Sequence, residues 1–409
     1  MAKLSSIAYY VTDKISSNDI SLAEYVTTDC ILQNKKGREV ATNLPPQPCS
    51  LIRYQRGDVL IANIRPYLKK VWFADIDGGA SPDVLVFRAK DGHSPSFLYA
   101  ILLQDSFFDY VMQGTKGSKM PRGDKEQILR YEMPTFSCSE ESIGTFFLNL
   151  DRKIHLNERI NQNLEAMAKQ LYDYWFVQFD FPNEDGEPYK SSGGEMIWNE
   201  SLKREIPKGW ITTTINGVCT SCRGVSYGKD DLLPNGNGVL VFRGNNIENN
   251  HIVYDSNVAF VPYDFINEEQ RIKEGDIVMT MSSGSKAHVG KCAMFYKDSE
   301  HTFGAFLSKF TPKKEMRYMI FLFLTSEYFK SLITAFCNGT GINNLTNQTF
   351  DDVILVLPNE NTLQQFESKV KPLFDIIGNN EENIEILTKQ RNELLPLLMN
   401  GQVSINSDL

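Results

Sequence analysis

The sequence predicts an α+β protein in which two strand-rich α/β units alternate with two long helices of coiled-coil type. Three observations predict it: a helical phrase that occurs twice, a set of landmarks ahead of each copy, and strand-type runs between those landmarks. Along the chain we therefore expect a strand-rich unit, a long helix, a second strand-rich unit and a second long helix.

The repeated helical phrase is I-H-L-N-E-R-I-N-Q-N-L at 154–164 and I-G-N-N-E-E-N-I-E-I-L at 377–387. Around both copies, apolar residues or Asn recur at steps of three and four, which is the seam of a coiled coil. Any two such helices look alike, but a shared Asn-Glu at one heptad position favours a true repeat. The seam residues that we expect to face a partner helix or partner protein are Ile154, Asn157, Leu164, Leu171, Ile377, Asn380, Leu387 and Leu394.

Landmarks ahead of the helices repeat in the same order, with separations between 218 (from 53 to 271) and 225 (from 114 to 339) residues. A nearly constant separation indicates an internal repeat. The pairs are R-Y-Q-R-G-D-V-L with R-I-K-E-G-D-I-V (53–60 and 271–278), G-T-K-G with G-T-G (114–117 and 339–341), and E-M-P with V-L-P (132–134 and 356–358).

The segments between the landmarks predict mainly strands and loops. V-L-I-A-N-I and V-L-V-F-R-A in the first half, and V-L-V-F-R and D-I-V-M-T-M in the second, are short β-type runs. Short helices are expected at 96–112 and 316–336, where apolar residues recur at helical spacing. Proline, Asn, Gly and Ser residues predict a polar hinge after the first long helix. The expected boundaries are 1–138 for the first strand-rich unit, 139–180 for the first helical region, 181–205 for the hinge, 206–360 for the second unit and 361–401 for the second helical region.

Composition and motifs argue against several classes of protein. No apolar run is long enough to cross a membrane, and seven irregularly spaced cysteines in 409 residues favour a reducing, cytoplasmic location. There is no phosphate-binding G-x-x-x-x-G-K-[ST] loop, and Cys219 and Cys222 form a lone C-x-x-C without a second pair for zinc. The five histidines are scattered. We therefore expect neither catalysis nor a metal site in this chain.

Two basic loops in the first half suit contacts to nucleic acid, although the net charge is −9. Lysine attracts phosphate, and arginine can donate a fork of hydrogen bonds to guanine O6 and N7. The alternative for each loop is a solvated surface turn. The candidate DNA-binding residues are Arg65, Tyr67, Lys69 and Lys70 after the G-D-V-L strand, and Lys116, Ser118, Lys119, Arg122 and Lys125 in the G-T-K-G loop.

The equivalent loops of the second half carry different side chains. The loop after G-D-I-V-M-T-M is rich in serine, and the second G-T loop offers amides, which pair with adenine N6 and N7, in place of cations. Either loop could instead be plain turn structure. The candidates are Ser282, Ser283, Ser285 and Lys286, and Thr340, Asn343, Asn344 and Asn347.

The alternation of two divergent units with two related helices resembles the specificity subunit of type I restriction–modification systems. The hinge strengthens the resemblance: W-F-V-Q-F-D-F-P-N-E-D-G-E-P-Y-K-S-S-G-G-E-M at 175–196, followed by I-P-K-G-W at 206–210, is similar to the central region of that family. The resemblance covers essentially the whole chain. In the strand-rich units it is limited to their framework.

The resemblance implies a non-catalytic reader of double-stranded DNA. Units 1–138 and 206–360 would be target-recognition domains, each reading half of a bipartite, asymmetric site. The helices would pair as an antiparallel coiled coil in a pseudo-two-fold arrangement and dock two methyltransferase (modification) subunits. S-adenosylmethionine, ATP and Mg would belong to partner subunits and no cofactor to this chain. Restriction or translocase subunits, and phage inhibitors that mimic DNA, are further implied partners; a membrane is not.

Two alternatives belong to other classes. A coiled-coil scaffold or adaptor that binds only proteins would need no variable basic loops, and a DNA-shift experiment would separate it from a DNA reader. An enzyme with a fused methyltransferase domain is disfavoured by the missing motifs.

Overall fold

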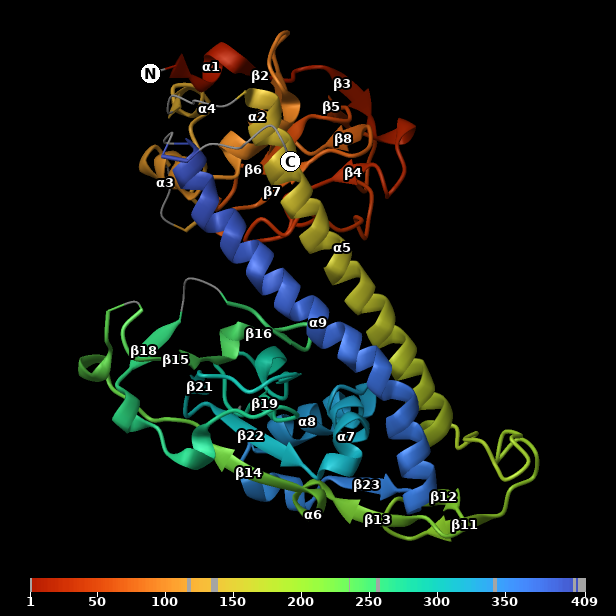
Figure 1. Cartoon of the computed structure of the whole chain (residues 1–409). Helices are drawn as coiled ribbons and strands as arrows, with labels where there is room; N and C mark the ends of the chain where they lie inside the picture. Colours follow the sequence, from red (N-terminus) through yellow and green to blue (C-terminus); the bar gives the residue numbers. More distant parts are fainter. Residues whose placement is uncertain are drawn as a thin grey trace. The chain divides into compact units, whose positions relative to one another are not determined.

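A computed structural model of the chain describes residues 2–115, 119–133, 139–234, 236–254, 258–340, 344–399 and 402–403. It is a mixture of helices and strands, which confirms the predicted fold class at that level (Figure 1). The chain divides into two compact units. Unit 1 is Met1–Glu158 with Asn383–Leu409, and unit 2 is Arg159–Glu382.

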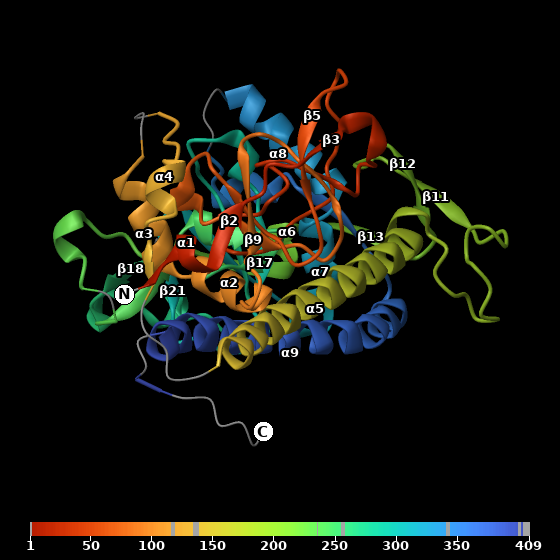
Figure 2. The same cartoon turned by 90° about the horizontal axis from the view of Figure 1, so that it is seen from above.

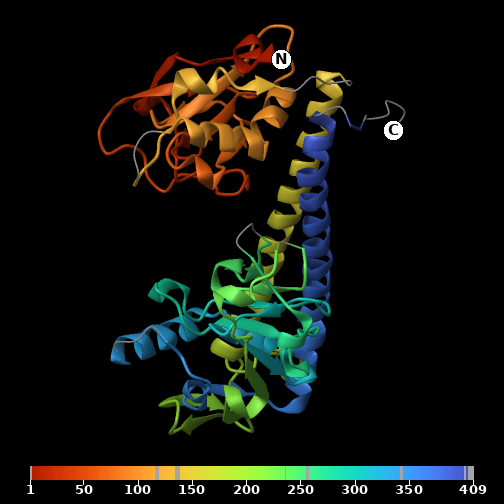
Figure 3. The same cartoon turned by 90° about the vertical axis from the view of Figure 1, so that its left-hand side faces the viewer.

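Two long helices, α5 (Glu140–Tyr172) and α9 (Glu360–Met399), each contribute one segment to unit 1 and one to unit 2. Within each unit the two segments lie side by side (Figures 2 and 3). In unit 2, the Asn380 amide donates to Asn161 at 2.8 Å. In unit 1, Arg391 binds Asp151 at 2.9 Å, with both side chains buried. Polar groups of this kind, buried where two helices meet, restrict the register in which the helices can pack.

Unit 1 contains two four-stranded sheets. The first has the order β2 (Ala8–Tyr10), β9 (Val84–Ala89), β6 (Val59–Ala62), β7 (Val71–Phe73), and every neighbouring pair is antiparallel. The second has the order β3 (Lys14–Ser16), β5 (Ser50–Tyr54), β8 (Gly78–Ala80), β4 (Tyr25–Val26), in which β4 runs parallel to β8. The other elements are β1 (Ala2–Lys3), α1 (Leu4–Ile7), α2 (Pro95–Leu102), α3 (Asp105–Gln113), α4 (Lys125–Ile128) and β10 (Glu132–Met133).

Unit 2 has a four-stranded sheet with the same pattern of pairing. Its order is β14 (Cys219–Arg223), β22 (Leu307–Pro312), β19 (Ile277–Thr280), β20 (Cys292–Met294), again antiparallel throughout. A second sheet joins β18 (Ala259–Val261), β15 (Val239–Phe242) and β21 (Thr302–Phe303), with β21 parallel to β15. The remaining elements are β11 (Met196–Asn199), β12 (Arg204–Pro207), β13 (Ile211–Thr214), α6 (Ile215–Val218), β16 (Ile247–Glu248), β17 (His251–Ile252), α7 (Arg317–Leu324), α8 (Glu327–Thr340) and β23 (Ile354–Leu357).

The repeated G-D landmark is a tight turn that leads into a fully buried strand in each unit. Gly57 and Gly275 have φ of +92° and +87°, a region that favours glycine. In unit 1 the Asp58 side chain accepts from the Gln55 N–H at 2.8 Å, and its two oxygens bind Arg88 of β9. In unit 2 the equivalent Asp276 accepts from the backbone N–H of residue 273 and binds a lysine of β22, Lys309, at 3.0 Å. Because a buried carboxylate is costly unless paired, the aspartate and the cation are needed together.

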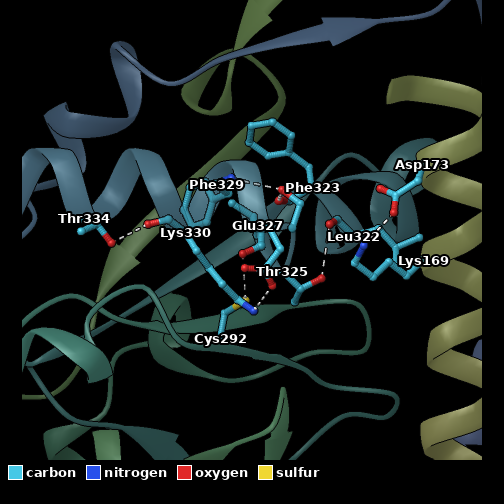
Figure 4. Close-up of polar contacts among 12 residues, drawn as sticks. Lys169, Asp173, Cys292, Leu322, Phe323, Thr325, Glu327, Phe329, Lys330 and Thr334 are labelled. Carbon is cyan, nitrogen blue, oxygen red and sulfur yellow. Dashed lines mark hydrogen bonds and ion pairs between the residues drawn. The ribbon is translucent and has the colours of Figure 1, made fainter. Parts of the chain in front are cut away.

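Each short helix predicted at 96–112 and 316–336 is two helices separated by a break. In the second segment, Ser326 lies at the break, and its hydroxyl oxygen accepts from the N–H of Phe329, a residue that Figure 4 labels near the start of α8. Serine at such a position stabilises a helix start and favours an interruption over a continuous helix. Glu327 and Lys330 form an ion pair on the outer face of α8. In the described part of the chain, no single helix is long and apolar enough to span a membrane, although Lys314–Leu324 and Glu327–Cys337, bent by 65°, are so when taken together.

The segment predicted as a polar hinge is anchored by aromatic rings. Phe181 stacks on Trp210 with ring centroids 4.7 Å apart, and Phe179 meets the same indole edge-on at 5.6 Å. Just after α5, Phe176 contacts Phe366 of α9, with ring centroids 4.7 Å apart. These buried rings stabilise the segment against the core of unit 2, so its polar residues form the outside of an ordered structure.

A β-hairpin contacts the long helices in each unit through a histidine. In unit 2, His251 of β17 lies between Glu165 of α5 (2.6 Å) and Glu381 of α9 (3.2 Å). Burial lowers the pKa of His251, but the two carboxylates outweigh it and raise the pKa to about 10. In unit 1, His155 of α5 packs against Gly37, where a Cβ atom would lie 3.1 Å from the ring. Burial opposes the charge of His155 too, yet hydrogen bonds to Asp151 and Glu158 raise its pKa to about 9.

These histidines predict a loss of stability at alkaline pH. A folded-state pKa above the ordinary 6.5 means that each charged histidine contributes fully below pH 6.5, and that its contribution is lost as the pH rises through 9 to 10. The thermal unfolding temperature should fall between pH 7 and pH 10, and His251→Gln should make that fall smaller. His288→Gln, an exposed control in unit 2, should reproduce the wild-type profile. Stability that increases over this range would contradict the assignment.

Candidate nucleic-acid interface

The structure brings together the two predicted loops of unit 1. The Arg65 N–H donates to the Pro121 carbonyl at 2.8 Å, and the Gly123 N–H donates to the Asn63 carbonyl at 3.3 Å. Ile64 and Arg122 form an isolated antiparallel bridge. Segments 64–70 and 119–125 therefore form one continuous surface, although they are far apart in the sequence.

A strained turn displays the aromatic residue of this surface. Arg65 and Lys69 have φ of +53° and +50° and flank a short 3-10 helix, Pro66–Leu68. Such angles cost roughly 1 kcal/mol or more for a residue with a side chain, so the surrounding contacts must hold them. Pro66 is buried, whereas the Tyr67 side chain is 49% exposed. The turn thus holds its backbone against the unit and leaves Arg65 and Tyr67 facing solvent.

Some of the predicted cations of unit 1 already bind an acidic or carbonyl group of the protein, and others are exposed. Lys69 binds Asp105 at 2.9 Å, and the ammonium of Lys70 donates to the Thr28 carbonyl at 2.6 Å. Burial lowers the pKa of Lys70. Lys119 and Lys125 are exposed. Lys116 and Ser118 lie outside the described residues. The exposed lysines are therefore better placed to meet a phosphate than Lys69 or Lys70.

A third loop belongs to the same surface and was missed in the sequence. The hairpin at 31–38 turns at Asn34 and Lys35, both with positive φ. Their N–H groups donate to the carbonyls of Leu68 (2.9 Å) and Lys69 (3.0 Å). Lys35 is buried and shares Asp105 with Lys69. The run N-K-K-G-R at 34–38 carried the signal, because Asn and Gly mark a turn among basic residues.

Unit 2 brings its own two predicted loops together in the same way. Ser282 and Asn344 form an isolated antiparallel bridge, and the Leu345 N–H donates to the Met281 carbonyl at 2.7 Å. Asn344 is exposed, whereas the Asn347 side-chain oxygen accepts from the Ser308 hydroxyl inside the unit. Ser283 is partly exposed, Ser285 and Lys286 are exposed, and Thr340 closes α8. The Thr340 side chain and Asn343 lie outside the described part.

The two interfaces occupy corresponding places in their units. Each is built from the loop after the buried G-D strand (β6 or β19) and the segment that bridges to it at Arg122 or Asn344. The side chains differ: unit 1 presents Arg, Lys and Tyr, and unit 2 presents Ser and Asn together with one exposed lysine, Lys286. Arginine suits phosphate or guanine, and asparagine suits adenine. The same framework therefore carries two different hydrogen-bonding patterns.

The described ranges of the chain contain no cluster of three or more His, Cys, Asp or Glu residues able to hold an ion. Cys219 and Cys222 lie three residues apart on strand β14, so their side chains point to opposite faces. Burial raises the pKa of the Cys219 thiol to about 12. The C-x-x-C is a structural part of a strand.

The seam residues are buried or half-buried. Ile154 and Ile377 are buried, and the rest are intermediate. Leu164, Leu171 and Ile377 pack on the core of unit 2, and Leu387 and Leu394 on the core of unit 1. The Asn380 amide contacts Asn161, which also donates to Glu381 at 2.8 Å.

A second row of apolar side chains on the long helices faces outward. In unit 2, Ile160 and Met167 of α5 and Tyr174 just after it recur every seven residues, and Val177 follows. Met167 is 54% exposed and Val177 is 51% exposed. In unit 1, Leu156 of α5 and Ile386 and Leu397 of α9 are exposed in the same manner. Apolar residues at heptad spacing on an outer face are typical of a surface that packs against another helix.

Comparison with known proteins agrees with this arrangement. Residues 207–394 match a family model described as the type I restriction modification DNA specificity domain. The specificity subunit of the type I restriction enzyme MjaIX of Methanocaldococcus jannaschii is 25% identical over 404 residues, covering 96% of this chain and 86% of that protein. The specificity subunit of HindI from Haemophilus influenzae is 23% identical and covers 98% of both chains. The crystal structure of the type I restriction–modification S subunit from M. genitalium, 13% identical, shares the fold with a TM-score of 0.56 over 97% of this chain and 95% of that one.

Proposed function

Since this chain belongs to the DNA specificity subunits of type I restriction–modification systems, we propose that it recognises double-stranded DNA in a sequence-specific manner. It is a specificity subunit and not a catalytic one. The observation that supports the proposal most is the pair of equivalent interfaces, one in each unit, with the same backbone frame and different side chains.

Each strand-rich unit would read one half of a bipartite, asymmetric site. We assign 1–138 and 206–360 as the two target-recognition domains and 181–205 as the hinge. A pseudo-two-fold repeat is supported by the matched sheets and by the buried Asp58 and Asp276 at equivalent strand starts. Two half-sites with different side-chain chemistry opposite them would differ in sequence, so the whole site would be asymmetric.

The helical regions 139–180 and 361–401 would pair as an antiparallel coiled coil that serves as a spacer. Within unit 2, Asn161 approaches Asn380 and Tyr172 approaches Phe366, so the residue numbers rise on α5 as they fall on α9. This progression, together with the buried seam, supports antiparallel pairing.

Two methyltransferase subunits would dock on the outward apolar row of the helices. Solvent-exposed side chains such as Met167 and Ile386 gain stability when a partner covers them, at about 25 cal/mol per Å². The partners would supply S-adenosylmethionine, and a restriction or translocase subunit would supply ATP and Mg chemistry. Phage inhibitors that mimic DNA would compete for the same basic surface of unit 1.

Mapping methylated adenines in cells that express this chain with its methyltransferase would test the function directly. A bipartite motif should appear, and exchanging 206–360 for the same region of a relative should change one half-site and leave the other intact. Both interface loops of unit 2, which meet at Ser282 and Asn344, lie within 206–360, so they should transfer together. A protein scaffold would give no motif, and a hybrid that alters both halves would contradict modular reading.

Replacing Lys119 with Ala should weaken DNA binding by the assembled complex across all sequences. A lysine that contacts phosphate releases a counterion, so the slope of log affinity against log salt should fall by about one unit. Titration at several salt concentrations measures the slope. Lys190→Ala, which removes an exposed lysine from the hinge, should leave it unchanged. If the two variants show the same slope, Lys119 does not face DNA.

Replacing Met167 with Glu should prevent capture of the methyltransferase subunits while leaving thermal unfolding unchanged. The side chain is half-exposed, so a charge is tolerated in the free chain, but a docked helix would bury it without a partner. Gln162→Glu adds the same charge to another exposed position of α5 and should assemble normally. Co-purification and gel filtration measure assembly, and normal capture by the Met167 variant would rule out this face.

A further inference from the structure

Asp83 in unit 1 and Phe306 in unit 2 occupy the same place in the two interfaces. Asp83 precedes β9 and Phe306 precedes β22, the strands that pair with β6 and β19. In unit 1 the Asn63 N–H donates to the Asp83 carbonyl at 2.9 Å. In unit 2 the Met281 N–H donates to the Phe306 carbonyl at 2.9 Å. Asn63 and Met281 are the residues that directly follow β6 and β19.

The side chains at this place have opposite chemistry. The Asp83 carboxylate binds Arg122 at 3.2 Å, with both side chains more than 40% exposed. Phe306 is 71% exposed. Its carbonyl also accepts from the Ser282 N–H at 3.2 Å, and Ser282 is the bridge partner of Asn344. A large aromatic side chain is thus presented to solvent beside an exposed amide.

Phe306 stands on a firmly held backbone. Its carbonyl accepts two N–H groups, and the Arg223 guanidinium donates to the carbonyl of the preceding residue, Ala305 (3.3 Å), and to that of Leu345 (2.8 Å). The side chain itself is not part of the core. Burial in the folded chain therefore does not explain a phenylalanine here, and a rigid frame is what a binding contact requires.

The chemistry of the pair indicates what it would meet. A phenyl ring forms no conventional hydrogen bonds, and the apolar feature of the major groove is the thymine C5-methyl group. The amide of Asn344 can pair with adenine N6 and N7. A ring beside an amide therefore fits A·T pairs. In unit 1, a carboxylate that orients Arg122 instead fits guanine, whose O6 and N7 accept two hydrogen bonds.

Building on the proposed function, we propose that Phe306 is a specificity-determining residue that contacts a thymine methyl group in the second half-site. Asp83 is its counterpart in the first half-site, where it positions Arg122. The difference between the two half-sites arises in part at this one position of the repeat. The ligand is duplex DNA, and the contact is apolar.

The test uses the complex of the full chain with its methyltransferase subunits and duplexes of the mapped site. Thymines of the second half-site, identified by the 206–360 exchange, are replaced singly by uracil, which removes only the methyl group. For one such thymine, affinity of the wild-type complex should fall about fourfold, as expected for one buried methyl. Uracil in the first half-site should change the affinity of the wild-type complex and of the Phe306→Ala complex by the same factor.

Phe306→Ala should bind the thymine duplex roughly tenfold more weakly, as expected for losing a buried aromatic contact, and should no longer distinguish thymine from uracil. Its thermal unfolding should match wild type, and Phe306→Leu should restore part of the discrimination. Tyr263→Ala removes another exposed aromatic of unit 2, 74% exposed, and should behave as wild type. A Phe306→Ala complex that retains full affinity, or retains the uracil penalty, would overturn the inference. A wild-type complex without any sequence preference would instead overturn the proposed function.

Discussion

The need to pair a buried carboxylate fixes the framework on which both interfaces stand. Asp58 and Asp276 are each 1% exposed at the start of a fully buried strand, and each is matched by a cation on the neighbouring strand. Removal of either partner would leave an uncompensated charge, which typically costs about 3–5 kcal/mol. The pair therefore holds the strand in register at one end, and the interface loop leaves from the other end. Variation in the loop is tolerated because the register does not depend on it.

The sequence predicted the parts of the molecule that follow from periodicity and from repeated landmarks. The G-D turn could be found because it needs glycine at positive φ followed by an acid, and the helix seams could be found because burial imposes steps of three and four. The long helices begin at Glu140 and Glu360, close to the starts expected. The sequence also indicated that the interface loops of the two units correspond, because the loop after the G-D strand and the G-T loop occur in the same order in both halves.

Other features depend on contacts between distant segments and left little trace in the sequence. The run at 34–38 marks a basic turn, but the backbone hydrogen bonds to Leu68 and Lys69 that join this hairpin to the unit 1 interface follow from the fold and not from the sequence pattern. The sequence alone does not distinguish Lys69 and Lys70 from Lys119. In the structure, however, Lys69 forms an ion pair with Asp105, and Lys70 donates a hydrogen bond to the Thr28 carbonyl. The two histidines looked scattered, and only the fold places each one between two carboxylates. In one unit the histidine is on the helix, and in the other it is on the hairpin, so the same contact arose from different residues.

The backbone frame around Phe306 has an evolutionary consequence. The main-chain carbonyl and not the ring is the group that the fold requires, because it accepts from the Met281 and Ser282 N–H groups. Selection for stability therefore constrains the path of the backbone at this point but hardly constrains which side chain stands there. Under the proposal that Phe306 contacts DNA, one codon change at this position would therefore alter the target while leaving the fold intact.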